Sequence, residues 1–170
     1  VLVVGALMVT SIVGFSVTSF AASDSSEDSV SASSSYRVFN VGTESELRSA
    51  LSRAWSGDYI QFYNDIEVSR TLYVNNAVTI NLNYHSLKFV YSSDGLVINS
   101  GYRNCVYLWN GRVHASVDSD AAVSVRRGDL SVYNCSIYAG NCKYHRSYDG
   151  NAIYCSSSAN RIWLDYVYLQ

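Results

Sequence analysis

The chain has 170 residues and a formal charge of −2, from 12 basic and 14 acidic side chains. Nucleic-acid binding relies on concentrated Lys and Arg, so this balance argues against a nucleic-acid partner. Hydrophobic residues make up 48% of the chain, which is enough for one domain with a core. The polar part is rich in Ser and Asn, with 15 Tyr and no Pro.

An apolar run opens the chain, with small side chains at positions 19 and 21, where a signal peptidase reads its substrate. We therefore expect residues 1–21 to be a signal peptide that is truncated at its start, since neither Met nor a basic segment precedes the apolar run. A transmembrane anchor is the competing interpretation, because the run is long enough to span a bilayer. Residues 22–35 are Ser-rich and acidic, which predicts an unstructured linker.

A short amphipathic helix is predicted next. Thr43 and Glu46 form a capping box, in which the Thr43 hydroxyl accepts from the Glu46 N–H and the Glu46 carboxylate accepts from the Thr43 N–H. Apolar residues at helical spacing follow at Leu47, Ala50, Leu51 and Ala54. Gly57 is expected to end the helix in a left-handed conformation.

From Tyr59 onward apolar and polar residues alternate, which predicts short strands whose inward residues recur in three series. The first series is Ile60/Phe62, Ile80/Leu82, Val106/Leu108, Leu130/Val132 and Ile162/Leu164. The second is Ile66/Val68, Leu87/Phe89, Val113/Ala115, Ile137/Ala139 and Leu169. The third is Leu72/Val74, Leu96/Ile98, Val123/Val125 and Ile153/Cys155.

The three series recur in the same order at similar intervals. This recurrence predicts an all-β fold, a right-handed parallel β-helix with three strands per coil and about four coils. The domain is expected to span residues 36–170, to begin with the helix as a cap, and to be incomplete at its C-terminus. A β-sandwich is the alternative, but its hairpins give no reason for the series to stay in register. The tight bend after the first series falls at Asn64, Tyr84, Asn110, Asn134 and Tyr166, where Asn favours left-handed backbone and can stack.

The run Thr43–Phe62 (TESELRSALSRAWSGDYIQF) resembles the opening of pectate-lyase-like proteins of the pectin lyase-like superfamily. The resemblance implies that the helix plugs the N-terminal end of a β-helix. It also implies extracellular polysaccharide as the partner, without deciding activity, because the superfamily includes lyases, hydrolases and adhesins.

Acidic residues gather at one predicted edge of the coil. Asp118, Asp120 and Asp149, with Asp94 on the same edge, are candidate ligands for Ca²⁺, which prefers carboxylate oxygens. Calcium-assisted lyases of the superfamily pair such a site with a basic residue. The candidate catalytic residues are therefore Arg126, Arg127 and Arg146. In the alternative interpretation, each Asp caps its own turn through hydrogen bonds to the backbone.

The longest predicted loop, residues 140–151, has a composition suited to sugars, because Tyr rings stack on pyranoses while charged side chains bond the hydroxyls. The candidate carbohydrate-binding residues are Lys143, Tyr144, His145, Arg146, Tyr148 and Asp149. A tolerated insertion without function is the alternative. A second candidate surface is the outward stripe Glu67, Lys88, His114 and Tyr138, which is also what a solvated sheet face shows.

The four cysteines, Cys105, Cys135, Cys142 and Cys155, permit disulfides in three connectivities. Cys155 falls in an inward slot, where we expect a buried free thiol. A zinc set of Cys135, Cys142, His145 and Cys155 matches no compact spacing.

Together these features predict a protein that is secreted or displayed on a bacterial cell surface and that binds or processes pectin or another cell-wall or host glycan. As an enzyme it would be a polysaccharide lyase or glycoside hydrolase. The alternative is a non-enzymatic adhesin or structural module. We expect a monomer with no membrane association after signal cleavage.

Overall fold

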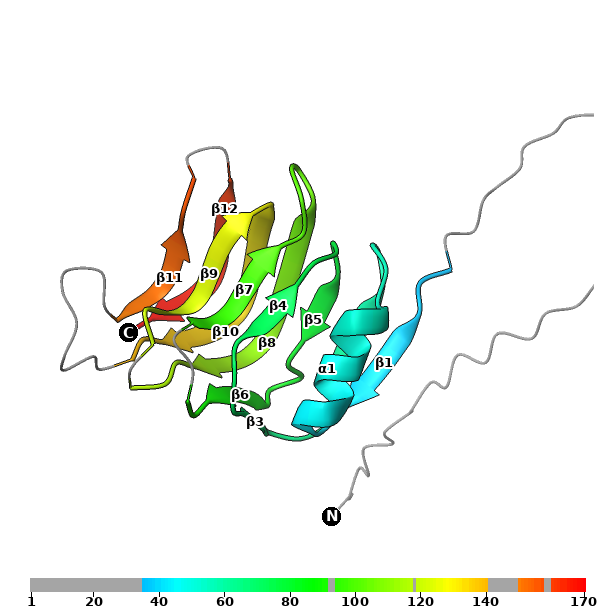
Figure 1. Ribbon diagram of the computed structural model, residues 1–170, viewed down its shortest axis with the longest axis horizontal. Coiled ribbons are helices and arrows are strands. Elements are labelled where there is room, and N and C mark those ends of the chain that lie inside the picture. The colour runs from blue at the N-terminus through cyan, green and yellow to red at the C-terminus, as the bar shows by residue number, and fades with distance from the viewer. Residues whose placement is uncertain (1–34, 92–93, 118, 141–149, 158–159) are drawn as a thin grey trace, which may run out of the picture. The chain divides into compact units, whose positions relative to one another are not determined.

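The computed structural model describes residues 35–91, 94–117, 119–140, 150–157 and 160–170. The predicted signal peptide and all but the last residue of the predicted linker lie outside these ranges. Over the described residues the fold is all-β, with parallel sheets and one helix (Figure 1). That helix is too short to cross a membrane. Among the described residues, no other helix is long and apolar enough to do so.

The elements follow one another closely along the chain. In order they are β1 (Val38–Val41), α1 (Glu44–Arg53), β2 (Tyr59–Phe62), β3 (Ile66–Val68), β4 (Leu72–Val74), β5 (Thr79–Asn81), β6 (Ser86–Phe89), β7 (Asp94–Asn99), β8 (Cys105–His114), β9 (Ala121–Arg127), β10 (Asp129–Tyr138), β11 (Asn151–Cys155) and β12 (Ile162–Leu169).

The strands form two sheets. The larger sheet has the order β1-β2-β5-β8-β10-β12, with β3 paired to β6 and β6 to the second half of β8, and the smaller has the order β4-β7-β9-β11. Every strand pairing among the described residues is parallel. Parallel pairing excludes the antiparallel hairpins of the alternative β-sandwich.

The strand pairing confirms the predicted second and third series. Along the second series Ile66 pairs with Leu87, Leu87 with Val113, Val113 with Ile137 and Ile137 with Leu169. Along the third, Leu72 pairs with Leu96, Leu96 with Val123 and Val123 with Ile153. The alternation therefore identifies both the inward side chains and their partners in these series.

The first series contains one wrong register. We expected Ile80 to align with Val106, but Ile80 pairs with Leu108. The chain takes seven steps from Ile80 to Leu87 and only five from Leu108 to Val113, so the earlier bend holds two more residues. The shift is even-numbered, so the inward residues stay inward.

The extra residues explain an unusual bend after β5. Asn83 and Tyr84 both have positive φ there, whereas the later bends each use one such residue, Asn110, Asn134 or Tyr166. Beneath this bend lies Gly111, where a Cβ would collide with the Leu82 side chain and the His85 carbonyl. The predicted left-handed bends are confirmed at four of the five positions, and Asn64 does not have positive φ.

Side-chain amides stack along these bends as predicted. Asn134 Nδ2 donates to Asn110 Oδ1 at 3.1 Å, and Asn110 Nδ2 donates to Asn81 Oδ1 at 3.1 Å. The stack thus ends at Asn81 because of the shifted register. It pairs the amide groups of Asn81 and Asn110, which are half-buried, where an unpaired polar group would be costly.

Helix α1 begins at its predicted cap, with the Thr43 hydroxyl accepting from the Glu46 N–H at 3.2 Å. The Glu46 carboxylate accepts from the Gly42 N–H at 2.8 Å, one residue earlier than predicted. The helix ends at Arg53 with an extended cap residue, Ala54, and Gly57 takes the predicted left-handed conformation in the turn that follows.

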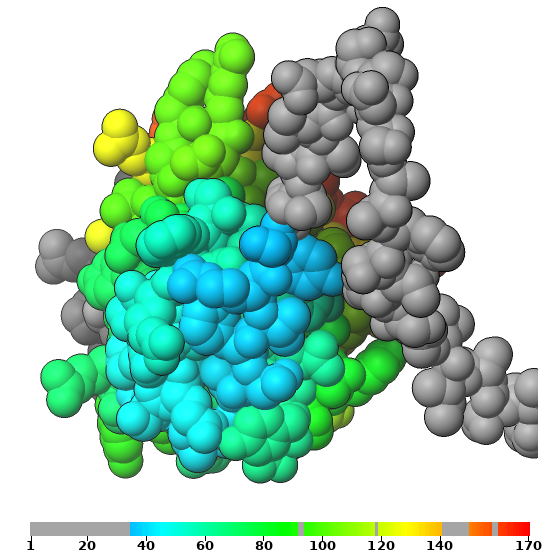
Figure 2. Space-filling model, turned by 90° about the vertical axis from the view of Figure 1, so that its right-hand side faces the viewer, coloured from blue at the N-terminus to red at the C-terminus, as the bar shows by residue number. Residues whose placement is uncertain are grey.

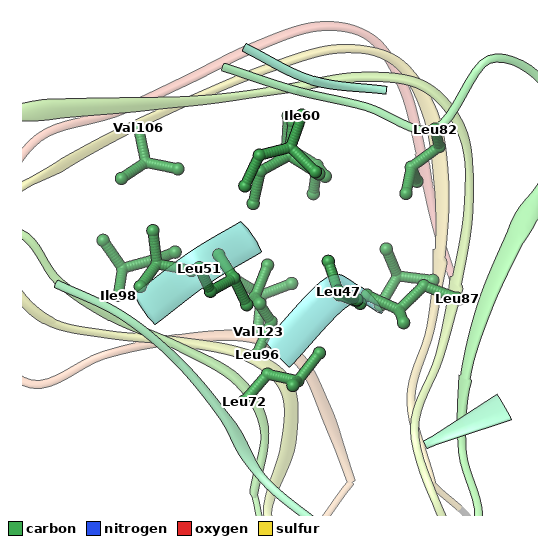
Figure 3. Close-up of a cluster of buried hydrophobic side chains, with 14 of the residues drawn as sticks. Leu47, Leu51, Ile60, Leu72, Leu82, Leu87, Leu96, Ile98, Val106 and Val123 are labelled. Carbon is green, nitrogen blue, oxygen red and sulfur yellow. The ribbon is translucent and has the colours of Figure 1, made fainter. Parts of the chain in front are cut away.

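One core fills the space between the two sheets. Leu47, Ala50 and Leu51 of α1 are buried in it together with the inward residues of the strands. Figure 3 shows Leu47 and Leu51 among inward side chains such as Ile60. Figure 2 views the domain from the end where β1 and α1 lie, and there these two elements, in blue and cyan, cover the strands behind them.

Candidate functional site

Two rows of outward side chains cross the larger sheet, and we call them together the aromatic face. The first row is Tyr59, Thr79, Tyr107, Ser131 and Trp163, on β2, β5, β8, β10 and β12. The second row, two residues further along the same strands, is Gln61, Asn81, Trp109, Tyr133 and Asp165. They lie outward because they alternate with the inward first-series residues.

Rings of the aromatic face contact other rings, both on the same strand and on other strands. Trp109 packs edge-on against Tyr59 and Tyr107, with ring centroids 6.2 Å and 5.9 Å away. Tyr133 packs in the same way against Tyr166, at 5.9 Å. These contacts are the edge-to-face geometry that aromatic pairs prefer, so the rings hold one another in place.

Large aromatic and small side chains alternate along the first row. Tyr59, Tyr107 and Trp163 lie on every second strand, and the small side chains of Thr79 and Ser131 lie between them. Adjacent strands are about 4.8 Å apart, so the three rings recur at roughly twice that spacing. The small side chains fill less of the space between the rings than an aromatic residue would.

One hollow of about 720 Å³ opens over β8, β10 and β12. Its lining is Tyr107, Trp109, Asn110, Ser131, Val132, Tyr133, Ile162, Trp163, Leu164 and Asp165. Aromatic rings, one side-chain amide, the Ser131 hydroxyl and one carboxylate therefore meet in one depression. A mostly apolar depression with a few polar groups is the usual composition of a binding site for an organic ligand.

The described candidates of the acidic edge are separated from this hollow. Arg126 forms an ion pair with Asp94, whose other oxygen accepts from the Ser124 hydroxyl at 3.0 Å. Asp94 and Arg126, to which we assigned different roles, thus bind each other on the smaller sheet. Arg127 and Asp120 are exposed. The backbone carbonyl of Asp120 accepts a hydrogen bond from the Asn151 N–H.

The other predicted site residues lie outside the described ranges. These are Asp118, Lys143, Tyr144, His145, Arg146, Tyr148 and Asp149. Within the described ranges, no three His, Cys, Asp or Glu side chains lie close enough to hold a metal ion. The calcium and sugar-loop hypotheses remain predictions.

The predicted outward stripe is aligned as expected, with Glu67 beside Lys88, Lys88 beside His114 and His114 beside Tyr138. Lys88 Nζ lies 2.7 Å from Glu67, and the His114 ring stacks on Tyr138 with centroids 4.4 Å apart. Burial lowers the pKa of His114, and the nearby Arg112 and Lys88 lower it further. This half of the sheet is charged, in contrast to the aromatic face.

The thiol prediction is wrong for Cys155. Cys155 pairs with Val125 as expected but is exposed, whereas Cys135 is buried. Burial raises the pKa of the Cys135 thiol to about 11, which keeps it protonated. Cys105, Cys135 and Cys155 are not joined in disulfides, and Cys142 and His145 of the zinc set lie outside the described residues.

The aromatic face was missed by the sequence interpretation. Its signal is present, because the residues between each first-series pair include Tyr107, Ser131 and Trp163. The predicted outward stripe covers only the corresponding residues of the second series. The long loop drew attention by its composition, while the aromatic face is assembled from short segments far apart in the chain.

No protein-family model, curated protein or solved structure matches the chain. The likeness to pectate-lyase-like proteins therefore rests on the run Thr43–Phe62 and on the parallel strand pairing alone.

Proposed function

We propose that the chain is a right-handed parallel β-helix with three strands in each coil. Successive strands of one series pair in parallel and are separated by two strands of the other series, as in β2, β5 and β4, β7. The stacked amides of Asn81, Asn110 and Asn134 support the proposal, since equivalent bends of stacked coils would bring them together. The buried α1 residues suit a cap on the first coil.

We further propose that the protein is exported and that it binds extracellular polysaccharide on the aromatic face. The observation that carries the proposal is the hollow between Trp109, Tyr133 and Trp163. Tyr and Trp rings offer flat apolar surfaces to the C–H faces of pyranose rings, and they lose little conformational freedom on binding. Asn110, Ser131 and Asp165 add hydrogen-bonding groups for sugar hydroxyls.

The arrangement suits a chain of sugars better than one sugar. Rings on β2, β8 and β12 are aligned across the strands, so an extended glycan lying across the sheet would meet several of them. Each contact would be modest, and affinity would accumulate with glycan length. Short and long oligosaccharides should therefore differ in affinity.

Binding without catalysis is the form of the proposal that the hollow favours. Glycoside hydrolysis generally uses a pair of carboxyl groups, and Asp165 is the one carboxylate among the described residues that line the hollow. This also supports the adhesin alternative, in which recognition alone is the function. Incubation with a bound glycan should release no shorter products, as measured by chromatography.

The test uses the chain's own fluorescence. Two of its three tryptophans, Trp109 and Trp163, belong to the aromatic face, and Trp55 lies at the end of α1. A Trp55→Phe variant would report only on the face during titration with oligosaccharides of increasing length. We expect a saturable spectral change, with affinity rising from disaccharide to hexasaccharide.

Substitutions locate the binding surface. Trp163→Ala should weaken glycan binding at least about tenfold, because a stacking surface is lost. Tyr73→Ala is the matched control, since Tyr73 is an exposed outward ring on the smaller sheet. Equal losses from both variants, or no glycan binding by the intact chain, would refute the proposal.

A further inference from the structure

We infer that the aromatic face selects neutral glycans and discriminates against polyuronates, with Asp165 as the discriminating residue. The inference rests on the proposed glycan binding and names its substrate class. Its basis is the distribution of charge on and around the face. The pectin resemblance would lead to the opposite expectation, because unesterified pectin is a polyanion.

The first step is the charge within the hollow. Asp165 is the one charged side chain among its described lining residues, and it lies beside Tyr133 on the neighbouring strand. The remaining polar groups of the second row, Gln61 and Asn81, are neutral amides. A ligand carboxylate stacked on these rings would therefore meet one negative charge and no lining cation.

The second step concerns Arg161, a cation that touches the face. Its guanidinium carbon lies 5.0 Å from the centre of the Trp163 ring. It is held there by Asp129, which accepts from Arg161 Nε at 3.1 Å and from Arg161 Nη2 at 2.7 Å. The Asp129 side chain is only 3% exposed, and its hydrogen bonds with Arg161 lower its pKa, so Asp129 is ionised and offsets the charge of Arg161.

The third step concerns the cations on the other half of the larger sheet. Lys88 is paired with Glu67, and Arg112 donates to the Ser86 hydroxyl at 3.1 Å. Arg112 follows the left-handed bend at Asn110, whereas the aromatic residues of β8 precede it. These cations therefore belong to a different part of the surface from the hollow.

These charges have opposite consequences for two classes of glycan. A polyuronate carries a carboxylate on each sugar, so several negative charges would approach Asp165 without a compensating cation among the described residues that line the hollow. A neutral glycan offers hydroxyl donors that the Asp165 carboxylate can accept, and such charge-assisted hydrogen bonds are stronger than neutral ones. Like charges at an interface disfavour the wrong partner.

The experiment compares ligands that differ mainly in charge. Hexagalacturonate, its fully methyl-esterified form and cellohexaose are titrated into the full chain with a chelator present, followed by tryptophan fluorescence and calorimetry. We expect at least one of the two neutral ligands to bind. Hexagalacturonate should bind at least about tenfold more weakly than that neutral ligand. Higher salt should narrow the difference, because it screens the repulsion.

Substitution of the discriminating residue completes the test. Asp165→Asn should narrow the difference in affinity between neutral and acidic glycans. Asp120→Asn is the control, because it removes the same charge beside the smaller sheet, and it should leave that difference in affinity unchanged. Hexagalacturonate binding as tightly as the best neutral ligand would overturn the inference while leaving the proposed function standing. If no glycan binds, both fail.

Discussion

The two ends of the larger sheet carry the same kind of inward side chain in very different surroundings. At the end covered by β1 and α1, Ile60 and Phe62 of β2 are fully buried. At the other end, Leu164 and Leu169 of β12 are 46% and 44% exposed, although they pair with buried residues of β10. Alternation thus decides which way a side chain points, while burial requires neighbours on both sides.

The two ends are alike in one polar feature, a paired Arg and Asp at the starts of adjacent strands. Arg37 and Asp58 form the pair beside β1, and Arg161 and Asp129 form the pair beside β12. In each, the carboxylate accepts from the arginine's backbone N–H as well as from its guanidinium. Unlike the apolar core, these bonds need only one adjacent strand, so they persist at the exposed end.

The largest effect should come from the core at the covered end. Phe62→Ala would leave a cavity between β1, α1 and β5, and should lower the free energy of unfolding by about 3–5 kcal/mol. Leu164→Ala, the matched change at the exposed end, should cost less than about 1 kcal/mol, since little is buried there. Urea denaturation of the two variants measures the difference, and equal losses would contradict the comparison.

A middle-sized effect is expected from Asp58, which also accepts from the Trp55 N–H at 2.7 Å and so ties the end of α1 to β1. Hydrogen bonds from Arg37 lower the pKa of Asp58 to about 2. Asp58→Asn should cost about 2 kcal/mol at neutral pH. Asp129→Asn should cost less, because among the described residues the Asp129 side chain accepts hydrogen bonds from Arg161 alone.

The same carboxylate predicts a pH dependence. Because the folded pKa of Asp58 lies below its ordinary value of 3.8, its contribution is complete above about pH 4 and is lost as the pH falls toward 2. Wild type should therefore lose stability over this interval more steeply than Asp58→Asn. Thermal melts at several pH values measure both slopes, and parallel curves would show that Asp58 contributes nothing.

The smallest effect should come from the helix cap. Thr43→Ala removes the acceptor of the Glu46 N–H and should lower stability by about 1 kcal/mol. Thr43→Ser keeps a hydroxyl and should stay close to wild type. The decrease in the free energy of unfolding measures how much the capping hydrogen bond contributes to holding α1 over this end of the core. An Ala variant as stable as wild type would mean that packing alone holds α1 in place.

Much of the fold was accessible to sequence reasoning because its signals are local. The Thr43 cap, the inward residues of each strand and the bends at Asn110 and Asn134 all follow from short segments. The register of Ile80 was not accessible. It depends on how many residues the bend at Asn83 and Tyr84 takes up, and no local pattern counts them.

The candidate site was less accessible. The aromatic rings at Tyr107, Tyr133 and Trp163 lie far apart in the chain, and they form a hollow only when their strands pair. The exposure of Cys155 was not accessible either, because an inward position predicts burial only where another strand covers it. Both cases required knowledge of which strands lie beside one another.

The sequence by itself thus determined the direction of each side chain, the start of the helix and the parallel recurrence of the strands, because these depend on neighbours along the chain. The tertiary structure alone decided the register at Ile80, the Arg–Asp pairs at both ends and the assembly of the aromatic face. The physical reason is that contacts between strands depend on the length of every turn between them, and burial depends on what lies on both sides.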